Sequence, residues 1–198
     1  MPRTLVIATR NRKKFDEMVA ILAGLPAEMK SLDAFPGVGA VEETGDTFEA
    51  NARLKALGYA RATGQWALAD DSGLEVDVLG GRPGVYSARW GGEEGNDLLN
   101  NARLLSDLAA FPPETWTARY RCVMALASPE EVLLVTEGAC EGLITDRAAG
   151  QNGFGYDPYF GLPEFGRTMA QIEPAVKNRL SHRGRALAAM RERLEKLL

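Results

Sequence analysis

The amino-acid sequence predicts an α/β fold, and three observations support this prediction. A short apolar run rich in β-forming residues, 4–9, leads at once into an amphipathic helical pattern. A second apolar run, 66–69, follows another helical segment and ends in two aspartates. Two strand-like segments, 117–127 and 132–139, are joined by a short polar stretch, which is typical of a hairpin. A chain of 198 residues is long enough for one domain, or for one domain with two lobes.

The first strand and the helix after it form a candidate anion site. The helix has Asn11 as its expected N-cap and Gly24 as its expected end. Its first turn has free backbone N–H groups, and four basic side chains crowd the same end: Arg10, Arg12, Lys13 and Lys14. Cations are unfavourable there, because the macrodipole is already positive at a helix N-terminus. An anion bound at this end would explain that cost; the alternative is a basic face exposed to solvent.

Residues 25–63 contain two adjacent glutamates and, after them, a helix with polar residues on one face. Residues 25–45 contain Pro and Gly breakers and predict a loop or extended segment. Two adjacent glutamates, beginning at Glu42, close this stretch before Thr-Gly, a pattern that by itself is typical of a solvated turn. A helix is expected over about 46–63, and on it Asn51 and Lys55 share one face because they lie four residues apart.

The second apolar run leads into two adjacent carboxylates, Asp70 and Asp71, followed by Ser72 and Gly73. In α/β folds, the loop that leaves a strand is where ligands and catalytic groups are held. Two aspartates there can bind a divalent metal, or one can act as a general base. The alternative is a plain strand-to-turn exit, since Asp-Asp-Ser-Gly is also good turn chemistry. Strand alternation would send Asp70 and Asp71 to opposite faces.

The second half of the chain is expected to hold further strands, two helices and two features of functional interest. Residues 74–79 alternate like a half-buried strand or form an extended connector, and 142–145 adds a short strand. Glycines and aromatics alternate in 150–158, whose rings can stack on a nucleobase or fill the core. A second basic cluster, 177–185, leads into a final helix. Another amphipathic helix is expected over 96–109, with Asn96 as its N-cap and an apolar stripe of Leu98, Ala102, Leu105 and Ala109.

Composition narrows the class of protein. The net charge of −4 argues against a broad nucleic-acid-binding surface. With a single histidine and no C-x-x-C motif, any metal would be held by oxygens, which favours Mg²⁺, Mn²⁺ or Ca²⁺. Cys122 and Cys140 lie in apolar segments and are expected to be buried free thiols. No signal-peptide pattern and no apolar run of membrane-spanning length appears, so we expect a cytoplasmic protein that does not bind membranes.

Several separate segments, in order along nearly the whole chain, match the motifs of one family. They are Ala8-Thr9-x-Asn11-x-x-Lys14, Glu42-Glu43-Thr44-Gly45 before Phe48-x-x-Asn51-Ala52, Leu54-Lys55-Ala56, Ala69-Asp70-Asp71-Ser72-Gly73-Leu74, Gly80-Gly81-x-Pro83-Gly84-Val85-Tyr86-Ser87-Ala88-Arg89, Gly153-Phe154-Gly155-Tyr156-Asp157-Pro158 and Ser181-His182-Arg183-Gly184. On these motifs the chain resembles the inosine-triphosphate pyrophosphatase family, also called the XTP/dITP diphosphatases. The resemblance implies Mg²⁺-dependent hydrolysis of aberrant purine nucleoside triphosphates, such as dITP, ITP and XTP, to the monophosphate and pyrophosphate.

The resemblance also implies an architecture. Residues 1–198 would form a single domain of this α/β type, with two lobes around a long mixed sheet flanked by helices. The active site would occupy a central cleft, and the protein would be a homodimer.

Individual residues receive roles from the same resemblance. Asp71 matches the family's proposed general base, and Glu42 with Asp71 matches its metal-binding carboxylates. Residues 9–14 would cradle the phosphates, although Arg10 stands where the family usually has Gly and would be strained if that position needs a positive φ. Lys55 and Ser72 would contact the phosphate or sugar, and Phe154 would stack on the base. The remaining base contacts would come from Gly155, Tyr156, Asp157, Lys177, His182 and Arg183.

Base selection has a chemical basis. A 6-oxo group accepts a hydrogen bond, whereas the 6-amino group of adenine donates one, so donors such as Arg183 would favour inosine and xanthosine. Two alternatives remain: a Maf-like pyrophosphatase acting on other modified nucleotides, and a nucleotide-binding sensor without turnover. Residues 154–157 and 181–183 match the purine-type family, and the presence of both Glu42 and Asp71 disfavours the sensor.

Overall fold

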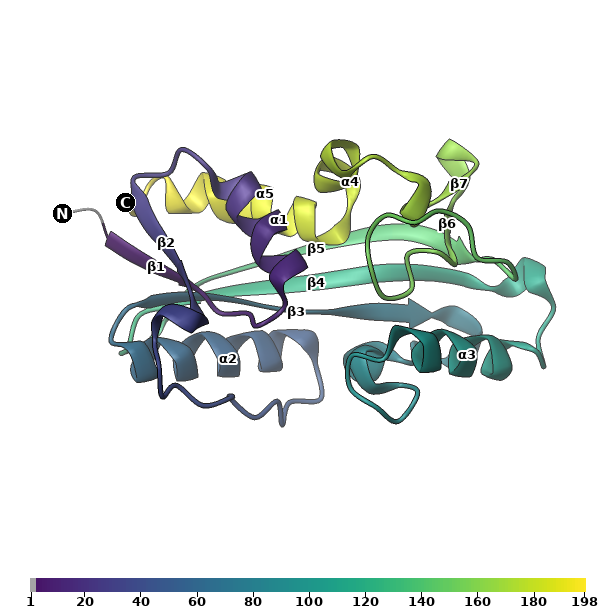
Figure 1. Ribbon diagram of the computed structural model, residues 1–198, viewed down its shortest axis with the longest axis horizontal. Helices are drawn as coiled ribbons and strands as arrows, with labels where there is room; N and C mark the ends of the chain where they lie inside the picture. The colour runs from purple at the N-terminus through teal and green to yellow at the C-terminus, as the bar shows by residue number, and fades with distance from the viewer. Residues whose placement is uncertain (1–2) are drawn as a thin grey trace. The chain divides into compact units, whose positions relative to one another are not determined.

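A computed structural model describes residues 3–198 and confirms the α/β class. Within these residues the strands form one seven-stranded sheet in the order β2-β1-β3-β4-β5-β6-β7 (Figure 1). The sheet is mixed, since β1 is parallel to β2 and β3, whereas β6 is antiparallel to β5 and β7. The strands are β1 Arg3–Ile7, β2 Ala27–Ser31, β3 Trp66–Val76, β4 Thr117–Ala127, β5 Val132–Ile144, β6 Phe160–Leu162 and β7 Arg167–Thr168.

Two of the helices begin at N-caps that the sequence predicts. The α-helices are α1 Arg12–Leu22, α2 Phe48–Thr63, α3 Asp97–Leu108, α4 Pro174–Leu180 and α5 His182–Leu194. Asn11 and Asn96 are confirmed as N-caps, because each side chain accepts a hydrogen bond from the backbone N–H three residues later. Thr47 caps α2 in the same way. None of the helices within residues 3–198 is both long enough and apolar enough to span a bilayer.

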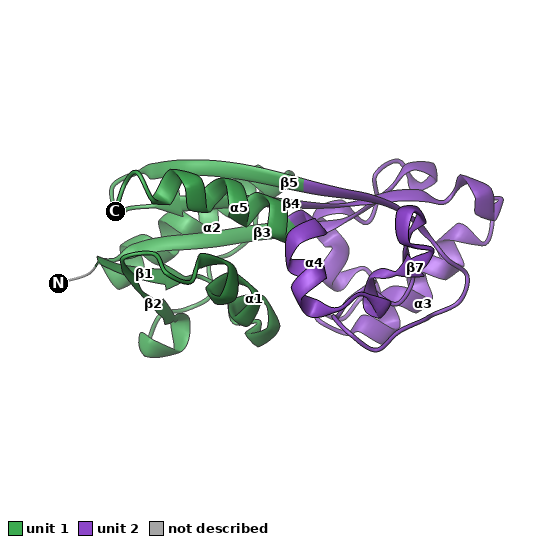
Figure 2. Cartoon of the chain, turned by 90° about the horizontal axis from the view of Figure 1, so that it is seen from above, with its two compact units in different colours: residues 1–71, 122–138, 183–198 green, residues 72–121, 139–182 purple. Residues whose placement is uncertain are grey.

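The chain divides into two compact units (Figure 2). The first unit comprises residues 1–71, 122–138 and 183–198, and the second comprises 72–121 and 139–182. In the first unit, α1 and α5 cover one face of the sheet and α2 covers the other (Figure 1). Its core joins apolar side chains of the strands to buried residues of α1 and α5, among them Leu68, Met18 and Leu187. The amphipathic pattern predicted for the first helix is thereby confirmed.

The core of the second unit is built around the inner face of α3. Leu104 and Leu108 are fully buried there against β-strand residues such as Leu74 and Phe160. The apolar stripe predicted for this helix is wrong, because Leu98 is 84% exposed. Asn100 and Asn101 take the buried face with the two leucines, since their amides bond to backbone groups of other segments.

Two predicted interruptions of strands are also wrong. The run 66–69 and residues 74–76 are parts of one continuous strand, β3, so Asp70 and Asp71 lie within a strand and not at its exit; residues 77–79 form a 3-10 helix. Likewise 132–139 and 142–144 belong to the single strand β5, which ends one residue before the predicted end of the second segment. The stretch 25–45 contains a strand as well, β2, which is a polar edge strand paired only with β1. In each case, pairing with neighbouring strands overrides local turn or loop preferences.

Candidate active site

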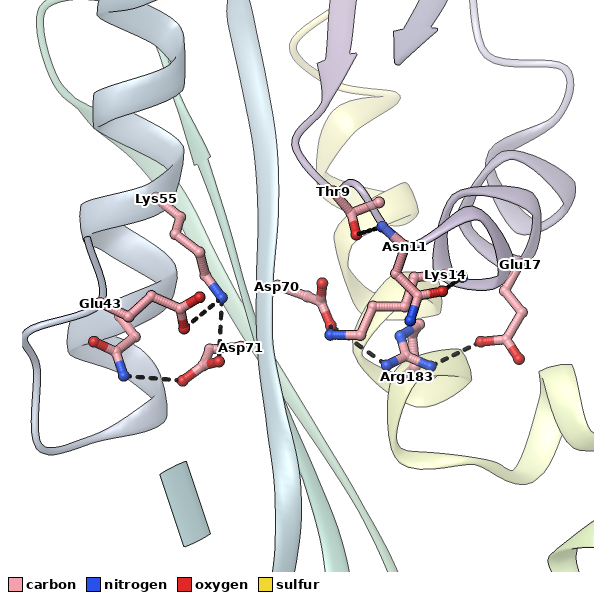
Figure 3. A network of polar contacts seen from close by, with 10 residues as sticks. Thr9, Asn11, Lys14, Glu17, Glu43, Lys55, Asp70, Asp71 and Arg183 are labelled. Atoms are coloured by element: carbon pink, nitrogen blue, oxygen red, sulfur yellow. Dashed lines mark hydrogen bonds and ion pairs between the residues drawn. The ribbon is translucent and has the colours of Figure 1, made fainter. Parts of the chain in front are cut away.

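Strand β3 sends its two aspartates to opposite faces of the sheet, as strand alternation predicts (Figure 3). The side chain of Asp71 points towards α2, whereas that of Asp70 points towards α1 and α5. Both residues are buried, at 7% and 3% exposure. A buried carboxylate needs cationic or hydrogen-bonding partners, and each of the two has its own set.

Helix α2 supplies the partners of Asp71. Lys55 Nζ lies 3.1 Å from Asp71 Oδ1 and 2.9 Å from Glu43 Oε2, so one ammonium group bridges two carboxylates. Asn51, one helical turn before Lys55, donates to Asp71 Oδ2 at 3.2 Å. The Oδ1 atom of Asn51 accepts from the backbone N–H of Gly45 at 2.8 Å, which fixes the segment that carries Glu43. The face of α2 predicted from four-residue spacing therefore organises this half of the site.

Burial and neighbouring charges shift the pKa of Asp71. Burial raises the pKa of Asp71 to about 6; the Lys55 ammonium opposes this shift, and the Glu43 carboxylate adds to it. Burial alone lowers the pKa of Lys55, but the nearby carboxylates, Asp71 foremost, outweigh it, so the net shift is upward. Lys55 therefore remains a cation at neutral pH. A carboxylate whose pKa lies near the working pH is suited to act as a general base.

Asp70 anchors two cations on the other face of β3. Its Oδ2 atom lies 3.0 Å from Lys14 Nζ and 3.4 Å from Arg183 Nη2. The other guanidinium nitrogen, Arg183 Nη1, pairs with Glu17 of α1 at 2.8 Å (Figure 3). Burial raises the pKa of Asp70, but Lys14 and Arg183 outweigh it and hold the pKa well below its ordinary value. Asp70 thus stays ionised and ties α1 and α5 to the strand.

The turn between β1 and α1 is held by side chains that cap backbone N–H groups. Thr9 Oγ1 accepts from the backbone N–H of Asn11 at 3.1 Å, and Asn11 Oδ1 accepts from that of Lys14 at 3.2 Å. No non-glycine residue in 3–198 has a positive φ, so Arg10 is not strained. Its guanidinium donates to the carbonyl of Val38 at 2.7 Å.

The other two basic residues of this turn differ in their surroundings. Arg12 forms an exposed ion pair with Asp16 at 3.0 Å, one helical turn along α1. Lys13 is exposed in the first turn of the same helix. Lys14, by contrast, is held by the buried carboxylate of Asp70.

In the second unit, Asp157 organises the aromatic loop. Its Oδ2 atom accepts from the backbone N–H of Phe154 at 3.0 Å and from Lys177 Nζ at 2.8 Å. Lys177 Nζ also lies 5.0 Å from the centroid of the Phe154 ring, a cation–π contact. The hydroxyl of Tyr120 donates to Asp157 Oδ1 at 3.2 Å, and the Tyr120 ring stacks on His182 with centroids 4.6 Å apart. We call residues 153–157 the base loop.

The predicted residues gather in two groups. The first unit contains the turn 9–14, Lys55, Asp71 and Arg183, and the second contains the base loop, Lys177 and His182. Ser72 directly follows Asp71 on β3 and is half-buried. Arg183, which the resemblance places at the base, lies in the first unit with Asp70 and Glu17 as partners.

Several residues of the two groups are not assigned a role by any sequence pattern. Glu43, and not Glu42, pairs with Lys55, although the two glutamates look equivalent in sequence. Glu17 and Tyr120 carry no motif signal at all, because a glutamate on a helix surface and an aromatic residue in a buried strand are ordinary. Asn51 was detectable from its spacing to Lys55.

The chemistry of the donors fits a hard divalent cation. Among residues 3–198, no three His, Cys, Asp or Glu side chains cluster in a ready-made metal cage. Carboxylate oxygens are available at Glu42, Glu43 and Asp71. Mg²⁺ usually binds through one or two carboxylates and completes its shell with water and substrate phosphates. The donor set fits that mode of binding.

Comparisons with known proteins agree along the whole chain. A model of the Ham1 family matches residues 5–193. The chain is 52% identical over 190 residues to the dITP/XTP pyrophosphatase of Geobacter sulfurreducens, with 96% of each chain covered. It is 49% identical over 193 residues to the dITP/XTP pyrophosphatase of Desulforamulus reducens, covering 98% of this chain and 96% of that one. The solved structure of a HAM1 protein from Coxiella burnetii is 38% identical and superposes with a TM-score of 0.91, covering 98% of this chain and 99% of that one.

Proposed function

Because the chain belongs to the Ham1 family, we propose that it hydrolyses aberrant purine nucleoside triphosphates such as dITP, ITP and XTP. The products are the nucleoside monophosphate and pyrophosphate, and the reaction removes these nucleotides from the pool. The observation that supports this most strongly is Asp71, a buried carboxylate with a pKa raised to about 6 and held by Lys55 and Asn51. A binding-only protein has no need for a base poised in this way.

The reaction cleaves the bond between the α-phosphorus and the oxygen that bridges to the β-phosphate. Asp71 accepts the proton of the attacking water, which adds to the α-phosphorus, and pyrophosphate departs with the bridging oxygen. Lys55 and Lys14 neutralise charge that develops on the phosphate oxygens. The backbone N–H groups at the start of α1 bind the phosphates, aided by the helix dipole.

The proposed reaction also uses a divalent cation. We propose that Glu42 and Asp71 hold Mg²⁺, with Glu43 as a neighbouring carboxylate. When bound, the metal supplies further neutralisation of the phosphate charge.

Selection of the base is assigned to the base loop and its partners. Phe154 stacks on the purine, and Lys177 and His182 provide donors near it. These donors suit a 6-oxo group and leave the 6-amino group of adenine without an acceptor. Arg183 is kept as a predicted base contact, and its guanidinium in addition pairs with Asp70 and Glu17. We also propose that the protein acts in the cytoplasm as a homodimer, which its sedimentation in solution would test.

Pyrophosphate release tests the function directly. We expect rapid release from dITP and XTP with Mg²⁺, slow release from ATP, and little release after chelation of the metal. Quantifying monophosphate, pyrophosphate and inorganic phosphate together identifies which bond is broken. Equal rates on all three nucleotides would contradict the selectivity, and release of inorganic phosphate in place of pyrophosphate would contradict the assigned bond.

A further inference from the structure

Helix α3 holds the backbone of the base loop at one residue, Gly155. Asp97 Oδ2 accepts from the N–H of Gly155 at 2.7 Å, and Asn101 Nδ2 donates to its carbonyl at 2.9 Å. The two side chains lie four residues apart and therefore on one face of the helix. Both polar groups of a single glycine are thus bound by side chains of one element. We call Asp97 and Asn101 the α3 clamp.

The hydrogen bond to Gly155 explains why position 101 holds an asparagine. Asn101 is 8% exposed, and its Nδ2 also donates to the carbonyl of Asp97 at 2.7 Å. Within residues 3–198, its Oδ1 atom is buried without a hydrogen-bond partner. An unsatisfied buried acceptor costs stability, and leucine would fill the same space without that cost. The amide is therefore needed for its two donors, one of which holds Gly155.

Gly155 is a point where a small rotation would move the whole loop. It has a φ of +65°, and a Cβ at this position would meet nothing within 4 Å, so glycine is required by the backbone angle and not by space. Phe154 precedes it and Asp157 follows two residues later, and the two are joined by the bond from Phe154 N–H to Asp157 Oδ2. Rotating the peptide of Gly155 would displace the aromatic ring and the carboxylate together.

We propose that Asp97 and Asn101 are positioning residues that set the peptide plane of Gly155 and thereby the purine selectivity of the base loop. This inference rests on the proposed function. The other anchors of the loop act at different residues: Lys177 and Tyr120 bind Asp157, and Tyr156 donates its hydroxyl to the carbonyl of Ser87 at 2.8 Å. The clamp is the set of side chains that fixes Gly155 itself, between the stacking ring and the buried carboxylate.

The test compares kcat and KM for dITP and dATP in Asn101→Leu, Asp97→Ala and Asp97→Asn. In the first two variants we expect KM for dITP to rise about tenfold, with kcat within about twofold, because uniform binding of the base is weakened. The ratio of kcat/KM for dITP over dATP should fall by a similar factor. Asp97→Asn keeps an oxygen that accepts from Gly155 N–H and should retain most of the selectivity.

Asn100→Leu is the matched control for Asn101→Leu, since it is the same substitution at the adjacent position of the same helix. Asn100 is 3% exposed and binds Gly91 N–H and the carbonyl of Ala88, not the base loop. It should lower Tm without changing the selectivity ratio. Hydrogen exchange of a peptide covering 150–158 adds a readout independent of turnover: exchange should accelerate in Asn101→Leu and Asp97→Ala but not in Asn100→Leu.

The outcomes separate this inference from the function on which it rests. A wild-type protein that prefers dITP, with Asn101→Leu and Asp97→Ala retaining the same ratio, would overturn the clamp alone. Equal losses of selectivity in Asn100→Leu and Asn101→Leu would do the same, by showing a general effect of disturbing α3. A wild-type protein that releases no pyrophosphate from dITP would overturn the proposed function and, with it, the selectivity role.

Discussion

Replacing Asp70 by asparagine removes the anion that the buried Arg183 and the partly buried Lys14 share. In the wild-type protein, Lys14 and Arg183 converge on one carboxylate oxygen, and the side chains of Arg183 and Asp70 are only 3% and 2% exposed. Removing one partner of a buried ion pair lowers the free energy of unfolding by about 3–5 kcal/mol, because the remaining charge stays desolvated. Arg183 keeps Glu17, and the amide oxygen of asparagine still accepts a hydrogen bond, so we expect the lower end, about 3 kcal/mol.

Thermal and urea unfolding measure this loss. For a chain of this size, 3 kcal/mol corresponds to a fall in Tm of about 6–12 °C. Asp16→Asn is the control, since Asp16 forms a surface pair with Arg12 in which the side chains are 57% and 77% exposed. Surface pairs contribute about 0–1 kcal/mol, so its Tm should fall by no more than about 4 °C. If Asp70→Asn shifted Tm no more than Asp16→Asn, the two cations would have to be solvated, and the reasoning from burial would be wrong.

Three further predictions concern the chemistry of individual groups. Asp71→Asn should lower kcat at least about 100-fold, the typical contribution of a general base; an active variant would exclude the assigned role. Its Tm should fall less than that of Asp70→Asn, because burial outweighs the pairing with Lys55 and raises the pKa of Asp71. Burial, with a smaller contribution from Asp70, raises the pKa of the Cys122 thiol to about 12, so iodoacetamide at pH 8 should modify it only after unfolding; rapid modification of the native protein would show that the thiol is accessible. Hydrogen bonds from Arg119 lower the pKa of the Asp77 carboxyl, so its NMR titration midpoint should rise in Arg119→Gln. An unchanged midpoint would mean that the bonds do not persist in solution.

Much of the fold and of the first half of the site follows from local sequence rules. The caps at Asn11 and Asn96 and the shared face of Asn51 and Lys55 depend only on neighbouring residues, and they are predicted correctly. The opposite directions of the two aspartates follow from strand alternation alone. These features can be predicted without knowing which residues pack against them.

Other features depend on contacts distant in sequence and are not predicted. Asp-Asp-Ser-Gly has the composition of a turn, yet β3 continues through it because Lys14 and Lys55 neutralise the acids. The buried face of α3 includes two asparagines, because their partners lie on segments far along the chain. The choice of Glu43 over Glu42 depends on how the loop before α2 is held.

The two aspartates of β3 also protect the strand against misalignment during folding. A shift by one residue in one direction would put Ala69 in the place of Asp70 and leave Lys14 without this anion and Arg183 with Glu17 alone. A shift in the other direction would put Ser72 in the place of Asp71 and leave Lys55 with Glu43 alone. Either shift also turns the apolar side chains of β3 to the opposite face, and the loss of one anionic partner adds to that cost. The two aspartates and their cationic partners therefore favour the observed register of β3 over the registers shifted by one residue in either direction.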